Sequence, residues 1–131
     1  MNATARNAIR RMTAAVRTAV QNTRAAWYAA LNGRTINDAL AIGWLIRTSE
    51  MLDRLFIDLP DGQQSWYGRH VVKAYRATHG RDPLKAWVQH RTTGRWIHVY
   101  VYAPDDKALI AGLWSYKATR PVAAALFSET A

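Results

Sequence analysis

Four histidines are the side chains of this sequence best suited to acid–base or metal chemistry: His70, His79, His90 and His98. Imidazole binds zinc or exchanges protons near neutral pH, but a site needs partner residues at a fixed spacing. No two of these histidines have the spacing of a metal motif, and the chain has no cysteine. It also lacks a Gly-rich phosphate loop and a Gly-x-Ser-x-Gly motif. We therefore expect no catalytic residue, no metal site and no cofactor.

One short acidic stretch, PDDK at residues 104–107, resembles a fragment of a nuclease motif. The acid-x-Lys element that such a motif needs on a neighbouring strand is missing. Asp105 or Asp106 is better explained as the N-cap of a helix that runs to about Lys117, because a carboxylate there accepts the free N–H groups of the first turn. The sequence favours a protein that binds rather than an enzyme.

Basic residues gather on one face of a helix expected at 66–79. Arg69, Lys73 and Arg76 are spaced i, i+4 and i+7, and no acidic residue interrupts the stretch from 63 to 81. The opposite face carries Tyr67, Val71, Ala74 and Tyr75. Arg81 follows the end of the helix. The basic face predicts contact with nucleic-acid phosphates, or an ordinary solvated surface.

A second basic row lies on a helix expected at residues 3–31, which Asn32-Gly33 should end. Arg6, Arg10, Arg17 and Arg24 fall within an arc of about 40°. They flank an apolar stripe of Ile9, Met12, Val16, Val20, Trp27 and Leu31. The row predicts a ridge about 27 Å long that follows phosphates. The alternatives are Arg stems that cover the edge of the core, or an organellar transit peptide. The same helix is a candidate for homo-oligomer formation.

Residues 85–102 alternate with period two and predict a β-hairpin with a turn at Thr93-Gly94. Its aliphatic face, with Val88 opposite Val99, should pack on the helices. The other face carries Trp87, Gln89, Arg91, Trp96, His98 and Tyr100, with Trp87 expected opposite Tyr100, and Arg91 and Arg95 at the tip. This face could stack on nucleic-acid bases or form a subunit interface, or one of the protein's own helices could cover it.

The expected fold is α+β and mostly helical, in the order α-α-α-β-β-α. A second helix should begin at Thr35 with a capping box and run to about Ile57. The loop DLPDGQQ should follow it, and Ser65 should cap the third helix. We expect a single domain over residues 1–131: a basic helix at 1–34, a helical core with the hairpin at 35–120, and a tail at 121–131.

The composition is strongly basic for a chain of 131 residues. Eighteen Lys and Arg oppose nine Asp and Glu, which gives a formal charge of +9. Such an excess attracts polyanions, although it also serves solubility. No apolar run approaches the 18 residues of a membrane span, and no secretory signal is visible. The lack of cysteine fits an intracellular location, in the cytoplasm or nucleoid or on a virion.

The segments WYGRHVVKAYRATHGRDP, RWIHVYVY and LIAGLWSY resemble small basic proteins of phages and mobile elements in high-GC bacteria. The resemblance covers residues 65–117. The order of elements there is similar to winged-helix-like viral DNA-binding modules, apart from the seven-residue loop before Ser65. The resemblance implies DNA binding, for example by a transcription regulator.

Together these features predict a non-enzymatic nucleic-acid-binding protein that acts on duplex DNA more than on RNA. The third helix and the hairpin tip would make the contacts, and the first helix would add phosphate contacts or dimerise. The alternative is a phage assembly protein or an inhibitor of a host factor. In that case the Trp-rich hairpin face and the apolar helices would form a protein interface.

Overall fold

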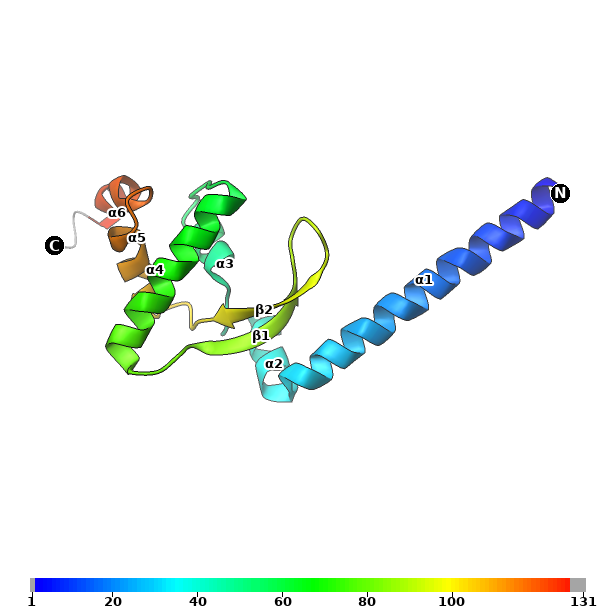
Figure 1. Ribbon diagram of the computed structural model, residues 1–131, viewed down its shortest axis with the longest axis horizontal. Coiled ribbons are helices and arrows are strands. Elements are labelled where there is room, and N and C mark those ends of the chain that lie inside the picture. The colour runs from blue at the N-terminus through cyan, green and yellow to red at the C-terminus, as the bar shows by residue number, and fades with distance from the viewer. Residues whose placement is uncertain (1, 128–131) are drawn as a thin grey trace.

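A computed structural model describes residues 2–127 and shows a long helix that extends away from a small body (Figure 1). This helix, α1, covers Ala3–Asn32. Its first turn is capped by the Asn2 side chain, which accepts a hydrogen bond from the Ala5 N–H at 2.8 Å. Its end lies at Gly33, where a φ of +85° is open to glycine and costly for other residues. The expected bounds of this helix are confirmed.

The apolar stripe of α1 does not enter the core, so the alternative that the Arg stems beside it cover the edge of the core is wrong. None of residues 3–32 is buried. Met12 is 69% exposed and Trp27 is 58% exposed. The reason is length: 30 residues make a helix of about 45 Å, longer than the body to which only its last turns attach.

The prediction of a single helix from Thr35 to Ile57 is wrong. The structure has α2 at Arg34–Ile42 and α3 at Thr48–Arg54. Gly43 ends α2 with a φ of +81°, and Ile46 then pairs with Tyr102 through two backbone hydrogen bonds of 2.8 and 2.9 Å. These bonds to a distant segment replace the helical ones. The expected Thr35 cap is also absent, because Gly33 occupies the N-cap position without a side-chain bond.

The third expected helix starts earlier than predicted: α4 covers Asp61–His79, so most of the expected loop is helical. Pro60 stands at its N-cap, where a missing N–H costs nothing, and Gly80 ends it. The following helix, α5, covers Lys107–Ser115, and its expected cap is confirmed at Asp106, which accepts from the Ala108 N–H at 2.9 Å.

The C-terminal segment forms α6 at Arg120–Phe127. Pro121, the first residue of the expected tail, lies in the first turn of α6, a position that tolerates proline. Of the expected tail at 121–131, residues 128–131 lie outside the described part of the chain.

The core lies where α4 packs against α5. Tyr67 and Val71 of α4 are fully buried, as are Leu109 and Leu113 of α5. The Tyr67 hydroxyl donates a hydrogen bond of 2.8 Å to the Leu109 carbonyl, so this large side chain is buried without an unpaired polar atom. Ile46, Leu52 and Tyr102 extend the core towards α3 and the end of the hairpin.

The hairpin consists of β1 at Leu84–Gln89 and β2 at Trp96–Val101, paired antiparallel. The same residues share each face as predicted, although Ile97 and Val99 of the aliphatic face line the groove described below and do not join the core. The register is shifted by two residues: Trp87 lies opposite His98 instead of Tyr100, and Val88 opposite Ile97 instead of Val99. The cause is the turn, which spans residues 91–94 instead of two residues. A shift of two keeps every side chain on its face.

The α+β class is confirmed. Within residues 2–127 the order is α-α-α-α-β-β-α-α, with two helices more than expected. No helix in the described part of the chain is long and apolar enough to cross a membrane.

Candidate functional site

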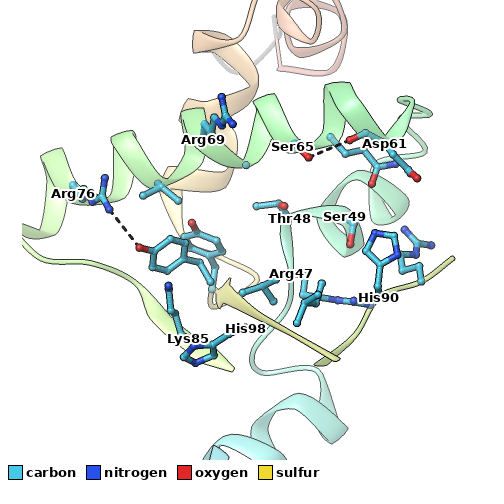
Figure 2. A pocket seen from close by; sticks show the side chains of 18 residues that line it. Arg47, Thr48, Ser49, Asp61, Ser65, Arg69, Arg76, Lys85, His90 and His98 are labelled. Carbon is cyan, nitrogen blue, oxygen red and sulfur yellow. Dashed lines mark hydrogen bonds between the residues drawn. The ribbon is translucent and has the colours of Figure 1, made fainter. Parts of the chain in front are cut away.

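A groove of about 600 Å³ lies between α4 and the hairpin, with the start of α3 at its side (Figure 2). We call it the α4–hairpin groove. Its volume is typical of ligand-binding pockets. Five basic side chains and one acidic side chain line it: Arg47, Arg69, Arg76, Lys85, Arg91 and Asp61.

Three of the five cations are paired with carboxylates just outside the groove. Arg91 lies 2.7 Å from Asp53. Arg47 lies 3.1 Å from Glu50 and also donates to the Gln89 carbonyl at 3.1 Å. These pairs position the guanidinium groups at the groove wall and neutralise much of their charge.

Arg76 is the third paired cation, and it connects α4 to the hairpin. Its guanidinium donates to Asp82 and to the Tyr100 hydroxyl at 3.4 Å, across the groove (Figure 2). The hydrogen bond to Asp82 raises the pKa of Arg76 above its ordinary value, so this group stays charged.

Arg69 and Lys85 are the two cations of the groove that have no carboxylate within ion-pair distance among residues 2–127. Arg69 lies over the ring of Trp66, 4.6 Å from its centroid, and Lys85 lies 4.8 Å from the ring centroid of Tyr100. Aromatic rings hold a cation without neutralising it. Arg69 belongs to α4 and Lys85 to β1, so each wall of the groove carries one free cation, and the Arg69 guanidinium is turned towards Trp66 at the rim.

Tyr102 adds a buried polar atom to the groove lining. The residue is 1% exposed, and its hydroxyl makes no hydrogen bond within the described part of the chain. Burial raises the pKa of Tyr102 well above its ordinary value, and the nearby Tyr100 adds to this shift. The hydroxyl therefore stays protonated, and it is covered from a ligand in the groove.

The groove also contains hydroxyl and imidazole groups that suit a polar ligand. Thr48 and Ser49 come from the first turn of α3, and Ser65 faces them from α4 (Figure 2). His90 and His98 come from the hairpin. The His90 Nδ1 accepts hydrogen bonds of 3.3 Å from two backbone N–H groups of the turn, which fixes the ring.

The predicted basic face of α4 is only partly in the groove. Arg69 and Arg76 line it, whereas Lys73 is exposed outside it. Arg91 joins them from the hairpin. Arg81, in the turn after α4, and Arg95, in the hairpin loop, are exposed and do not line the groove.

The aromatic face of the hairpin is divided between two environments. Tyr100 and His98 line the groove, whereas Trp87 and Trp96 pack against Tyr28 of α1. Tyr28 stacks on Trp96 at 4.6 Å between ring centroids with an angle of 15°. The last turns of α1 therefore cover part of this face, which was one of the three expected alternatives.

The arginines of α1 do not take part in the groove. Arg6, Arg10, Arg17 and Arg24 are exposed along the helix that extends from the body (Figure 1). They form a separate cationic surface.

The other two histidines form isolated contacts. The His70 Nδ1 lies 2.7 Å from the Ser115 Oγ, and His79 lies 3.6 Å from Asp106. A Ser–His pair requires a third group to orient the imidazole for nucleophilic catalysis, and among residues 2–127 the other contact of the His70 ring is the stacked ring of Tyr116. Within residues 2–127 no group of three His, Asp or Glu side chains could hold a metal ion.

Sequence reasoning missed Arg47, Lys85, Tyr102 and the hydroxyl residues as parts of the site. Lys85 could have been found, because alternation places it on the face of Trp87. Arg47 could not, because it lies in a segment that was predicted to be continuous helix.

Comparison with protein-family models, with curated proteins and with solved structures finds no match for this chain.

Proposed function

We propose that this protein binds nucleic acid without catalysis and that the α4–hairpin groove takes a single strand. The observation that carries the proposal is the pair of free cations, Arg69 and Lys85, on opposite walls of the groove. The net charge of +9 adds long-range attraction for a polyanion. Lys73, Arg81 and Arg95 are exposed outside the groove and add to the attraction for a strand.

The shape of the site favours a single strand over the duplex DNA expected from the sequence. A helix that reads the major groove must protrude, because that groove is about 12 Å wide. Here Arg69 and Arg76 of α4 line a hollow whose other wall is the hairpin. A single strand fits a concave site, with phosphates on the cations and bases against aromatic and imidazole rings. Tyr100 and His98 line this groove, and Lys85 and Trp87 already cover one ring face of each.

The test is a fluorescence anisotropy titration of labelled single-stranded DNA, single-stranded RNA and duplex DNA between 50 and 300 mM salt. For single strands, each phosphate contact contributes about 0.7 to the log–log salt slope. Arg69→Ala and Lys85→Ala should each reduce the slope by about this amount. The matched control is Arg11→Ala, which removes the same charge from an exposed position on α1.

Equal slopes for the wild type, Arg69→Ala and Lys85→Ala would exclude the groove from the interface. Tighter binding of duplex than of single strands would overturn the choice of ligand. A loss of slope in Arg11→Ala equal to that of the groove variants would mean that the protein responds only to net charge.

A second function, in assembly with other protein chains, is favoured by the amount of exposed apolar surface. Apart from the stripe on α1, Phe56 is 95% exposed, Trp44 71% and Ile42 61%. Exposed apolar groups of this size commonly mark protein interfaces. An assembly protein of this kind would keep its oligomeric mass when the groove cations are replaced, and would show no saturable binding to any of the three nucleic acids.

A further inference from the structure

The apolar stripe of α1 repeats every eleven residues. Ile9, Val20 and Leu31 are eleven apart, as are Val16 and Trp27. Eleven residues over three turns give 3.67 residues per turn, so the stripe stays on one side of a nearly straight helix. It runs about 33 Å from Ile9 to Leu31. All of these side chains are at least 46% exposed. A row this long and regular is typical of a helix that packs lengthwise on another helix.

The two flanks of the stripe differ in chemistry. One flank carries Arg6, Arg10, Arg17 and Arg24. The other flank, at the same distance around the helix, carries Ala8, Ala15, Ala19 and Ala26. All eight residues are exposed. Each of these alanines lies within two residues of one of the arginines along the chain. Each small side chain on one flank therefore has a large one at nearly the same height on the other flank.

We propose that α1 pairs with α1 of a second copy of this chain, in parallel and in register. In a parallel pair related by a two-fold axis, each flank meets the opposite flank of its partner. The Arg stems of one helix would then cover the alanines of the other, with their charged ends in water. In an antiparallel pair, Arg would face Arg and Ala would face Ala. That arrangement brings eight arginines together along one side and leaves the small side chains unfilled.

The body leaves the stripe accessible to this partner. Tyr28 and Asn32 attach α1 to the hairpin, and they point about 100° to 140° around the helix from the centre of the stripe. A second helix can therefore approach along the stripe without meeting the body of its own chain. A second copy of α1 fits the stripe better than a membrane surface does, because a membrane would not need alanine on one flank and arginine on the other.

The first experiment measures the mass of the full chain in solution without nucleic acid, by sedimentation at micromolar concentrations. We expect twice the monomer mass for the wild type. Val16→Glu places a charge in the stripe and should give a monomer with the melting temperature of the body unchanged. The control, Thr18→Glu, adds the same charge on the opposite face of α1 and should remain a dimer. A monomeric wild type, a mass of three or more copies, or a dimeric Val16→Glu would overturn the proposal.

The second experiment tests the direction of the pair and uses the absence of cysteine in the chain. Ile9→Cys and Val20→Cys, each as a single substitution, should both form a disulfide-linked dimer on mild oxidation. In an antiparallel pair only a residue at the crossing point can meet its own copy, and positions 9 and 20 are about 16 Å apart. Asn22→Cys, on the outer face of α1, should stay monomeric on a non-reducing gel. Cross-linking at only one stripe position, or at neither, would overturn the parallel arrangement.

The salt dependence gives an independent measure. In the parallel pair the arginine rows lie on opposite sides, farther apart than the Debye length of about 8 Å at 0.15 M salt. The dimer dissociation constant should then change less than threefold between 0.1 and 0.5 M salt. A tenfold or greater tightening would indicate facing arginines and contradict the proposal. Binding of the wild type to anionic vesicles with loss of the dimer would assign the stripe to a membrane surface and overturn it as well. These tests contain no nucleic acid, so they can fail while the proposed function stands.

Discussion

At Gly112, helix α5 lies in close contact with α4. A Cβ atom at this position would lie 2.5 Å from the Val71 Cγ2 and 3.2 Å from the Val71 Cα. The second contact is with backbone, which cannot rotate away. The tight packing of Tyr67 and Leu109 around this point therefore depends on the missing side chain.

We expect Gly112→Ala to lower the free energy of unfolding by about 1–3 kcal/mol, because overpacking forces the two helices apart. This loss exceeds the gain of up to about 1 kcal/mol that alanine brings to a helix. Gly62→Ala is the control, since its Cβ would meet nothing within 4 Å. It should leave the stability unchanged or raise it slightly. Urea unfolding followed by fluorescence measures both variants, and equal midpoints would contradict the packing argument.

At the level of single residues, contacts between residues close in the sequence could be predicted, and contacts between residues far apart in the sequence could not. The Asp106 cap and the Gly33 and Gly80 helix ends were predictable because the chemistry lies within a few residues. The shared face of Arg69 and Arg76 followed from helical spacing. The ion pair of Arg91 with Asp53 was not predictable, because 38 positions separate these residues and only the fold brings them together.

The junction between α1 and the hairpin is the main contact that the long helix makes with the body. The Asn32 side chain accepts from the Trp87 N–H at 2.6 Å and donates to the Trp87 carbonyl at 2.9 Å. It also donates to Asn37 at 3.1 Å, and Asn37 in turn donates to the Ala29 carbonyl at 2.7 Å. One amide thus connects α1, α2 and β1.

Asn32→Ala should weaken this junction without unfolding the body. Each lost hydrogen bond costs about 0.5–1.5 kcal/mol. Amide hydrogen exchange at Trp87 should therefore accelerate by roughly tenfold, since 1.4 kcal/mol corresponds to a factor of ten. Asn22→Ala, an exposed position on α1, is the control. If the Trp87 amide exchanged at the wild-type rate in Asn32→Ala, the side-chain amide would not be what holds the helix in place.

For whole elements, periodicity predicted the faces better than the boundaries. The hairpin faces were correct, although the register was not, because a shift of two residues preserves alternation. The break at Gly43 was missed because apolar residues continue on both sides of it. What ends the helix there is the pairing of Ile46 with Tyr102, and no local pattern shows it.

Two buried tyrosines, Tyr67 and Tyr102, connect different elements of the body. Tyr67 joins α4 to α5, and Tyr102 lies where the end of the hairpin meets Ile46. Burial raises the pKa of both phenols well above their ordinary value near 10. Both groups are therefore neutral in the folded chain at pH values where they would ionise in the unfolded chain.

The body should consequently unfold in alkali. Below pH 10 both phenols are protonated in the folded and the unfolded chain, and their contribution to the free energy of unfolding is complete. Above pH 10 only the unfolded chain loses these protons, so the free energy of unfolding falls as the pH rises towards the raised pKa of the folded chain. Two groups give a slope of about 2.7 kcal/mol per pH unit. Urea midpoints at pH 8, 10 and 11 measure it. Tyr102→Phe removes no hydrogen bond within residues 2–127 and should halve the slope, while the midpoint at pH 8 stays near wild type. A slope unaffected by this change would contradict the assignment.

The Asn32 amide has a further consequence for the behaviour of the chain in concentrated solution. A two-stranded sheet has unpaired backbone groups on both outer sides, and such groups can recruit other chains into fibrils. By bonding both the N–H and the carbonyl of Trp87, Asn32 occupies the outer side of β1 as a neighbouring strand would. At Trp87, the end of the long helix therefore leaves no unpaired backbone group on this side of β1 for another chain to pair with.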